Sequence, residues 1–152
     1  MERAELIRVR LELINREIRN THLVAVSKAT DIESIEYALQ LGQSSFGENR
    51  VGDLEEKSLF LKDRAIDWHF IGHLQSNKMN RLLRIPNLKY IHSIDSLKTL
   101  ETLYKKEEHF LGDSLGFFLQ VNTSGEDEKQ GFCSDKYDEL AGAANQIGRA
   151  HV

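Results

Sequence analysis

Five polar stretches follow short apolar runs along the chain, and they contain residue types that bind ligands or transfer protons. These stretches are Ser27–Lys28, Gly47–Arg50, Gly72–Lys78, His92–Ser96 and Asn122–Glu126. In parallel α/β folds the residues that follow each strand meet at one edge, where ligands bind. Strand-to-helix turns favour Gly, Asn, Ser and Asp anyway, so any single stretch would indicate only a turn. Five such stretches, with Lys, His and Gln among them, predict a polar site.

Lys28 is the residue with the most specific chemistry. It directly follows the apolar run Leu23–Val26 and Ser27, so its side chain is expected to start inside the fold. A lysine in apolar surroundings loses its proton more easily, and a neutral amine is what Schiff-base chemistry requires. A lysine at a strand end can also extend into water or pair with a carboxylate. Both interpretations of Lys28 remain open at this point.

Other candidate sites are weaker. On a strand, His69 and His73 would lie about 13 Å apart, too far to share one metal ion, and no metal site is expected. The G-x-S-x-G match at Gly112–Gly116 precedes an expected strand and does not join a strand to the following helix, so a serine hydrolase is not indicated. The single cysteine, Cys133, excludes an intrachain disulfide, and it is expected to be a small packed side chain.

Composition narrows the class of protein. The 152 residues include 20 basic and 24 acidic ones, and the net charge of −4 argues against a strongly basic nucleic-acid-binding protein. No apolar run approaches the ~18 residues of a membrane span. The start of the chain, Met1–Glu5, lacks the apolar region of a signal peptide. We therefore expect a cytoplasmic protein without nucleic-acid or membrane partners.

Strand and helix patterns alternate along the chain. After a helix over Met1–Asn20, strands are expected at Leu23–Val26, Ser44–Gly47, Asp67–Ile71, Leu88–His92 and Gly116–Val121. A helix follows each strand, at about 30–41, 49–61, 76–84, 96–104 and from Ser134. Thr30 and Glu33 form a capping box for the first of these, and Gly42 ends it. The alternation predicts an α/β fold with a parallel sheet, and it suits both a doubly wound sheet and a (β/α) barrel.

Six segments, in this order, resemble one family closely: the YggS/PROSC family of pyridoxal-phosphate-binding proteins, also called pyridoxal phosphate homeostasis proteins. The matching segments are Leu23–Lys28, Phe46–Val51, Trp68–Lys78, Ile91–Ser96, Gln120–Asn122 and Ser124–Glu126 with Lys129 and Gly131. The eleven-residue segment Trp68–Lys78 is the most specific of them.

The resemblance implies a (β/α)8 TIM-type barrel like the N-terminal domain of alanine racemase. Pyridoxal 5′-phosphate (PLP) would be bound as an aldimine to Lys28, and the family's other cofactor-lining positions correspond to Asn49, His73 and Ser93. In the family the phosphate is held mainly by residues from the last strands, which lie beyond the end of this sequence.

The same resemblance implies a non-catalytic PLP-binding protein involved in intracellular PLP homeostasis, with PLP-dependent apo-enzymes as partners. One alternative is a PLP-dependent, racemase-like enzyme, because a fold does not fix a function. A third hypothesis is a cofactor-free protein in which Lys28 is only structural.

The length of the chain leads to a further expectation. A closed barrel has eight strands and typically ~250 residues, whereas five strands are expected here within residues 1–145. We expect only about the first five β/α units, as an arc of strands open to solvent. Residues 146–152 back-translate to a common sequencing-adapter sequence and are expected to form a non-native tail that packs on nothing.

Overall fold

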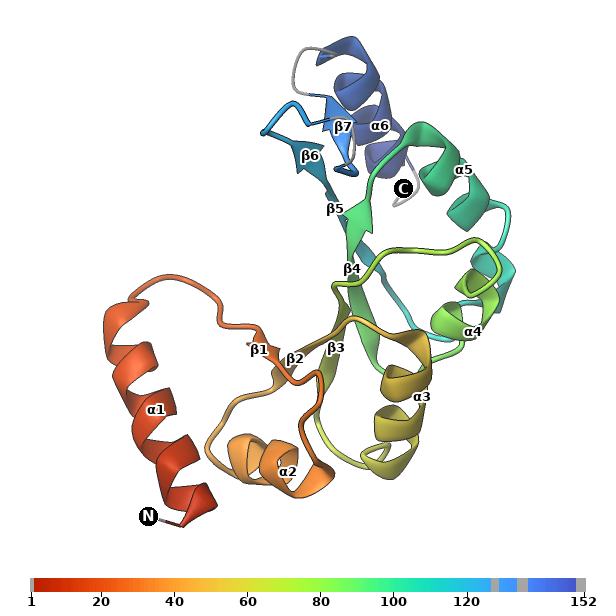
Figure 1. Ribbon diagram of the computed structural model, residues 1–152. Coiled ribbons are helices and arrows are strands. Elements are labelled where there is room, and N and C mark those ends of the chain that lie inside the picture. Colours follow the sequence, from red (N-terminus) through yellow and green to blue (C-terminus); the bar gives the residue numbers. More distant parts are fainter. Residues whose placement is uncertain (1, 127–128, 134–136, 150–152) are drawn as a thin grey trace.

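The computed structural model describes residues 2–126, 129–133 and 137–149, and it contains the predicted alternation of strands and helices (Figure 1). The helices are α1 (Arg3–Glu17), α2 (Ile32–Gln40), α3 (Val51–Phe60), α4 (Met79–Leu83), α5 (Leu97–Tyr104), the 3-10 helix η1 (Glu107–His109) and α6 (Tyr137–Arg149). The strands are β1 (Ala25–Val26), β2 (Ser45–Glu48), β3 (Asp67–Phe70), β4 (Leu88–Ile94), β5 (Gly116–Leu119), β6 (Val121–Asn122) and β7 (Phe132–Cys133).

Strands β1 to β5 form one parallel sheet in which the spatial order of the strands is their order along the chain. A doubly wound sheet reverses its strand order at a switch point. The five strands show no such reversal, so the doubly wound alternative is wrong for this sheet. Successive parallel strands, each followed by a helix, are the arrangement of a barrel wall, although the sheet does not close within the described residues.

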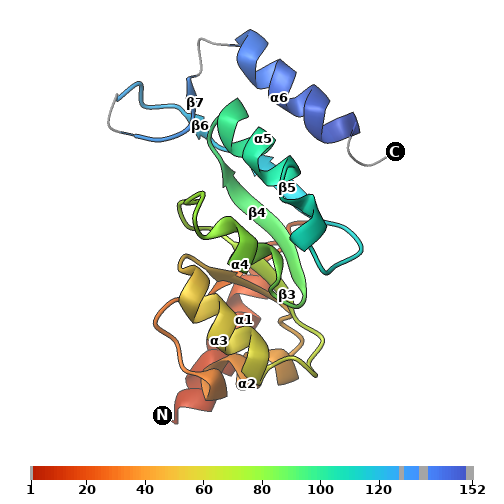
Figure 2. The ribbon, with the colours of Figure 1, turned by 90° about the vertical axis from the view of Figure 1, so that its right-hand side faces the viewer.

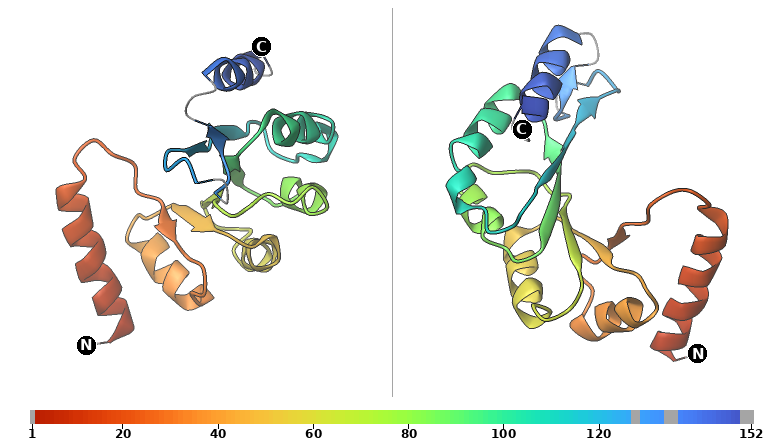
Figure 3. Two further views of the ribbon diagram at one scale, coloured as in Figure 1. Left: turned by 45° about the horizontal axis from the view of Figure 1, so that its top comes forward. Right: turned by 180° about the vertical axis from the view of Figure 1, so that it is seen from behind.

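One layer of helices covers one side of this sheet. Figures 2 and 3 show α2, α3, α4 and α5 following one another along the outer side of the curved sheet. Their fully buried side chains, such as Leu54 and Leu100, share a core with Trp68 and Ile91 of the strands. The apolar helix faces therefore pack on one face of the strands, which directs the other face away from the helices.

The inner side of the sheet carries a row of residues in register: Val26, Gly47, His69 and Tyr90 lie on neighbouring strands. Of these, Val26 is 53% exposed and Tyr90 is 39% exposed, and the neighbouring Phe118 of β5 is 50% exposed. Apolar and aromatic groups thus contact water on this side, in agreement with the open arc of strands that the sequence predicts.

Three details differ from the sequence predictions. The N-cap of α2 is Asp31, whose carboxylate accepts a hydrogen bond from the Ser34 amide, so the prediction of Thr30 is wrong by one residue. Cys133 is exposed and does not pack in the core, because side chains alternate along β7 and Phe132 takes the buried side. The short parallel pair of β6 and β7 was not predicted at all.

The end of the described chain also differs from the prediction. Helix α6 continues to Arg149, and Ile147 is half-buried against the core. The expectation that the segment from Gln146 packs on nothing is therefore wrong for Ile147. Residues 150–152, and the predicted helix start at Ser134, lie outside the described residues. None of the described helices combines the length and apolar composition needed to cross a lipid bilayer.

Candidate functional site

Lys28 lies just beyond the end of β1, at the carboxyl edge of the sheet. Its neighbour Ser27 extends the ladder with β2, because the Ser27 amide donates to the Gly47 carbonyl at 2.9 Å. The chain then turns sharply, with Ala29 at a φ of 58°. Ser27 is buried whereas Lys28 is exposed, so the expectation that the Lys28 side chain starts inside the fold is wrong. Strand β1 is an edge strand of the described sheet, and the turn after it carries the Lys28 side chain into solvent.

Asn49 and His73 line one groove of about 540 Å³ at the same edge, together with the start of α3 and Lys78. At the base of this groove the backbone of Gly72 lies in close contact with the backbone of Asn49. A Cβ on Gly72 would lie 2.0 Å from the carbonyl oxygen of Asn49, so only glycine allows the ends of β2 and β3 to approach this closely. Both Asn49 and His73 are exposed and able to contact a ligand.

Ser93 lies near the end of β4 and is 5% exposed. Its hydroxyl is buried without a hydrogen-bond partner among the described residues. A buried hydroxyl in this state retains an unused donor and acceptor. The structure thus brings Asn49 and His73 into one groove, while Lys28 and Ser93 lie at the ends of the neighbouring strands outside that groove's lining.

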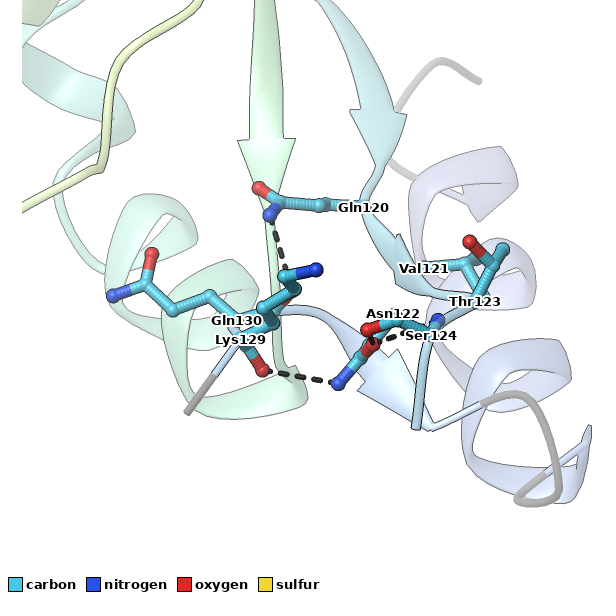
Figure 4. Close-up of a pocket in the computed structure, with 7 residues that line it drawn as sticks. All are labelled: Gln120, Val121, Asn122, Thr123, Ser124, Lys129 and Gln130. Carbon is cyan, nitrogen blue, oxygen red and sulfur yellow. Dashed lines mark hydrogen bonds between the residues drawn. The ribbon is translucent and has the colours of Figure 1, made fainter. Parts of the chain in front are cut away.

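The fifth polar stretch forms a second pocket, of about 450 Å³, which is lined by β6, its neighbouring residues, Lys129 and Gln130 (Figure 4). Its polar groups largely bond to one another. Asn122 donates to the carbonyl oxygens of Glu126 and Lys129, at 2.9 and 3.1 Å, and accepts from the amides of Ser124 and Gly125. Gln120 likewise donates to the carbonyl of Gln130. These bonds hold the loop in shape, and they account for Asn122 without a ligand.

Sequence reasoning missed a stacked cluster on the inner side of the sheet. The ring of His69 stacks on Tyr90, and that of His92 stacks on Phe118. Burial, together with the nearby His92, lowers the pKa of His69 to about 4. Burial also lowers the pKa of His92. Both rings are therefore neutral near pH 7. Successive side chains of a strand point to opposite faces of the sheet, and this alternation along β3 and β4 was the signal in the sequence that could have placed the two histidines on the same face.

A buried ion pair was also missed. Lys57 of α3 donates from Nζ to Oε1 of Glu48 at 2.6 Å, and Glu48 is fully buried. Sequence inspection treats a lysine within an amphipathic helix as solvated, and only the fold brings Lys57 under the end of β2. No group of three or more His, Cys, Asp or Glu side chains in the described part of the chain could hold a metal ion.

Several known proteins with similar sequences carry the same name. A pyridoxal phosphate homeostasis protein of Helicobacter pylori strain J99 is 44% identical over 110 residues, which are 72% of this chain and 48% of that protein. The Mus musculus protein of that name is 39% identical over 114 residues, or 72% of this chain and 42% of its own length. The Schizosaccharomyces pombe protein is 38% identical over 136 residues, 86% and 56% of the two chains. This chain is a homologue of the pyridoxal phosphate homeostasis proteins.

This chain spans about half the length of these relatives. Its fold matches PipY of Synechococcus elongatus PCC7942, a structure solved with PLP bound, with a TM-score of 0.77 and 31% identity over 93% of this chain and 63% of PipY. The same protein without PLP gives a TM-score of 0.80 at 33% identity, over 91% of this chain and 65% of PipY. No protein-family model matches the chain.

Proposed function

We propose that this chain is part of a non-catalytic PLP-binding protein that serves intracellular PLP homeostasis, with Lys28 as the covalent anchor of the cofactor. The observation that carries the proposal is the exposed amine of Lys28 at the carboxyl edge of a parallel sheet whose fold matches PLP-bound PipY. Ligands bind at this edge in parallel α/β folds. An exposed lysine beside a polar groove is accessible to an aldehyde in solution.

The residues present suit this cofactor chemically. PLP offers an aldehyde, a flat ring with polar substituents and a phosphate, and as an electron sink it stabilises carbanions when bound to enzymes. Lys28 has the primary amine that an aldehyde requires. Ser93 holds a buried hydroxyl without a partner among the described residues, and such a group is stabilised when a ligand completes its hydrogen bonds.

Each of the other residues has a distinct role in the proposal. Asn49 provides an amide that can donate and accept hydrogen bonds, and His73 provides a flat ring that can stack on or hydrogen-bond to the cofactor. Both line the groove of about 540 Å³ at the ends of β2 and β3. They orient the ring of the cofactor and abstract no proton, while Lys28 holds it.

We also propose that the five described strands are the first five β/α units of a (β/α)8 barrel. The sequential order of β1 to β5, the helices on one outer side, and the exposed aromatic rings on the inner side support this. In such a barrel the inner side chains pack in layers against strands from the opposite wall.

Covalent labelling tests the anchor. The full chain is incubated with PLP, reduced with borohydride and mapped by peptide mass spectrometry. We expect the label on Lys28 and its loss in Lys28→Ala, while Lys62→Ala, which removes an exposed lysine beyond α3, keeps it. Labelling of Lys78 or Lys129 in place of Lys28 would refute the assignment.

Two further measurements test the supporting roles and the absence of turnover. Asn49→Ala and His73→Ala should weaken PLP binding or shift its absorbance while Lys28 is still labelled. Loss of all labelling by either variant, with the fold intact, would contradict Lys28 as the only anchor. The PLP-loaded protein should not racemise D- or L-amino acids, and multiple turnovers in that assay would favour a racemase-like enzyme instead.

A further inference from the structure

A buried network joins the two strand ends that precede Lys28 and Asn49. Lys57 of α3 donates from Nζ to two acceptors, Oε1 of Glu48 at 2.6 Å and the carbonyl oxygen of Ser27 at 2.8 Å. The hydroxyl of Ser27 donates to the same carboxylate oxygen at 2.8 Å. All three residues are at most 9% exposed. The network therefore connects β1, β2 and α3 without involving solvent.

Two residues of this network directly precede proposed PLP-binding residues in the sequence. Ser27 is the residue immediately before Lys28, and Glu48 is the residue immediately before Asn49. The Ser27 carbonyl also accepts from the amide of Thr30 at 3.0 Å, which closes the turn containing Lys28. Lys57 thus holds the peptide group that joins Ser27 to Lys28, together with the last residue of β2.

Burial of an ion pair is costly, and replacement by apolar side chains is often neutral or stabilising. A buried pair is therefore weak evidence for a purely stabilising role. Here the ion pair and Ser27 form three hydrogen bonds at the ends of two adjacent strands, and Oε2 of Glu48 has no partner within the described chain. A pair retained only for stability would not need contact with the Ser27 carbonyl.

We propose that Lys57 and Glu48 are positioning residues that fix Lys28 relative to Asn49 through the backbone of Ser27. The inference rests on the proposed PLP-binding function, and it adds residues that touch no ligand themselves. Without the network, the turn after β1 would sample several conformations. The amine of Lys28 would then spend only part of its time beside the groove, and apparent affinity falls in proportion to that fraction.

PLP titration of the full chain tests the proposal. Lys57→Met removes the cation, and the double variant Glu48→Gln with Lys57→Met removes both charges so that no uncompensated carboxylate is buried. The matched control is Glu55→Gln, which breaks an exposed ion pair between the same helix and Arg81 of α4. Circular dichroism checks the fold of each variant, and absorbance of bound PLP is followed as a function of pH.

We expect both Lys57 variants to bind PLP at least about tenfold more weakly and to show a displaced pH profile of the bound chromophore. A tenfold loss corresponds to about 1.4 kcal/mol. Glu55→Gln should match the unmodified chain, and Lys57→Arg should recover part of the loss because it keeps the charge. An unchanged affinity and pH profile in the folded double variant would overturn the proposal. If Lys57→Met and the double variant both unfold, Ser27→Ala tests the proposal instead, because it removes only one hydroxyl. Its PLP affinity and the pH profile of its bound chromophore are then compared with those of the unmodified chain.

A cofactor-free readout separates this inference from the proposed function. Amide hydrogen exchange of segment 26–31 reports the turn directly, because the Thr30 amide bonds to the oxygen that Lys57 contacts. Exchange there should be at least about tenfold faster in the double variant and unchanged in Glu55→Gln. If the unmodified chain failed to bind PLP while exchange behaved as expected, the proposed function would fail but the positioning role would stand. Unchanged exchange in the double variant would overturn the positioning role.

Discussion

Nδ1 of His69 lies 2.9 Å from Nε2 of His92, so the two imidazoles of neighbouring strands share one hydrogen bond. One ring nitrogen must donate and the other accept, which requires the accepting ring to be neutral. Nε2 of His69 is buried without a partner among the described residues. Protonation of both rings would therefore remove this hydrogen bond, and a charge on His69 would lie in a poorly solvated position.

The histidine pair predicts a loss of stability in mild acid. The pKa of His69 is lowered by burial and by His92 to about 4, from an ordinary value of 6.5. Between these values the unfolded chain binds more protons than the folded one, so the free energy of unfolding falls as the pH falls through this window. The expected contribution is on the order of 1–3 kcal/mol. Urea unfolding at a series of pH values measures it.

His69→Gln is the matched variant for this measurement, since it keeps a hydrogen-bonding group but no longer titrates. Asp67 and His22 also act on the charge of His69, and they remain in both proteins. The variant should lose less stability between about pH 6.5 and pH 4 than the unmodified chain. Identical pH dependence in the two proteins would show that His69 is protonated freely in the folded state.

Gly72→Ala should destabilise the fold at the base of the groove. The added Cβ would meet the Asn49 carbonyl at 2.0 Å, and this contact is with backbone that cannot rotate away. Forced shifts of this kind typically cost about 1–3 kcal/mol. The control is Gly52→Ala in α3, where a Cβ has open space and should stabilise the helix by up to about 1 kcal/mol. Chemical denaturation should give midpoints displaced in opposite directions, and equal midpoints would contradict the tight contact.

Asp31→Ala should destabilise the chain by about 1 kcal/mol through loss of the α2 cap. The Asp31 carboxylate accepts from the Ser34 amide and also pairs with Arg3 of α1. Arg3→Ala isolates that exposed ion pair, which is expected to contribute no more than about 1 kcal/mol. Thr30→Ala tests the residue that the sequence motif suggested, and thermal unfolding should place its effect within about 0.5 kcal/mol of zero. A larger loss for Thr30→Ala than for Asp31→Ala would reverse the assignment of the cap.

The order of elements was predictable because it depends on local patterns. Apolar runs such as Leu23–Val26 and the helical spacing of Leu97, Leu100 and Tyr104 indicate strands and helices without reference to the rest of the chain. The cap of α2 was misplaced by one residue because Thr30 and Asp31 are both good capping residues. Only the path of the backbone decides which of them faces the Ser34 amide.

The site was less predictable, since it depends on contacts between distant segments. The family resemblance indicated Lys28, Asn49, His73 and Ser93, but residue types alone did not indicate that Asn49 and His73 share a groove. Lys57 is nine positions from Glu48 and thirty from Ser27. A charged residue in a helix is usually solvated, so its burial depends on where α3 packs. Lys28 is exposed for a similar reason, because the turn at Ala29 follows the edge strand β1.

The sequential order of the strands in the sheet has a consequence for how the chain is made. Each of β2 to β5 pairs with the strand synthesised just before it, so every new pairing closes a loop of one α-helix and its turns, to which η1 is added between β4 and β5. Contacts over short sequence separations have a low entropic cost of closure and favour rapid folding. The sheet can therefore grow one unit at a time as the polypeptide leaves the ribosome, with each nascent edge serving as the template for the next strand.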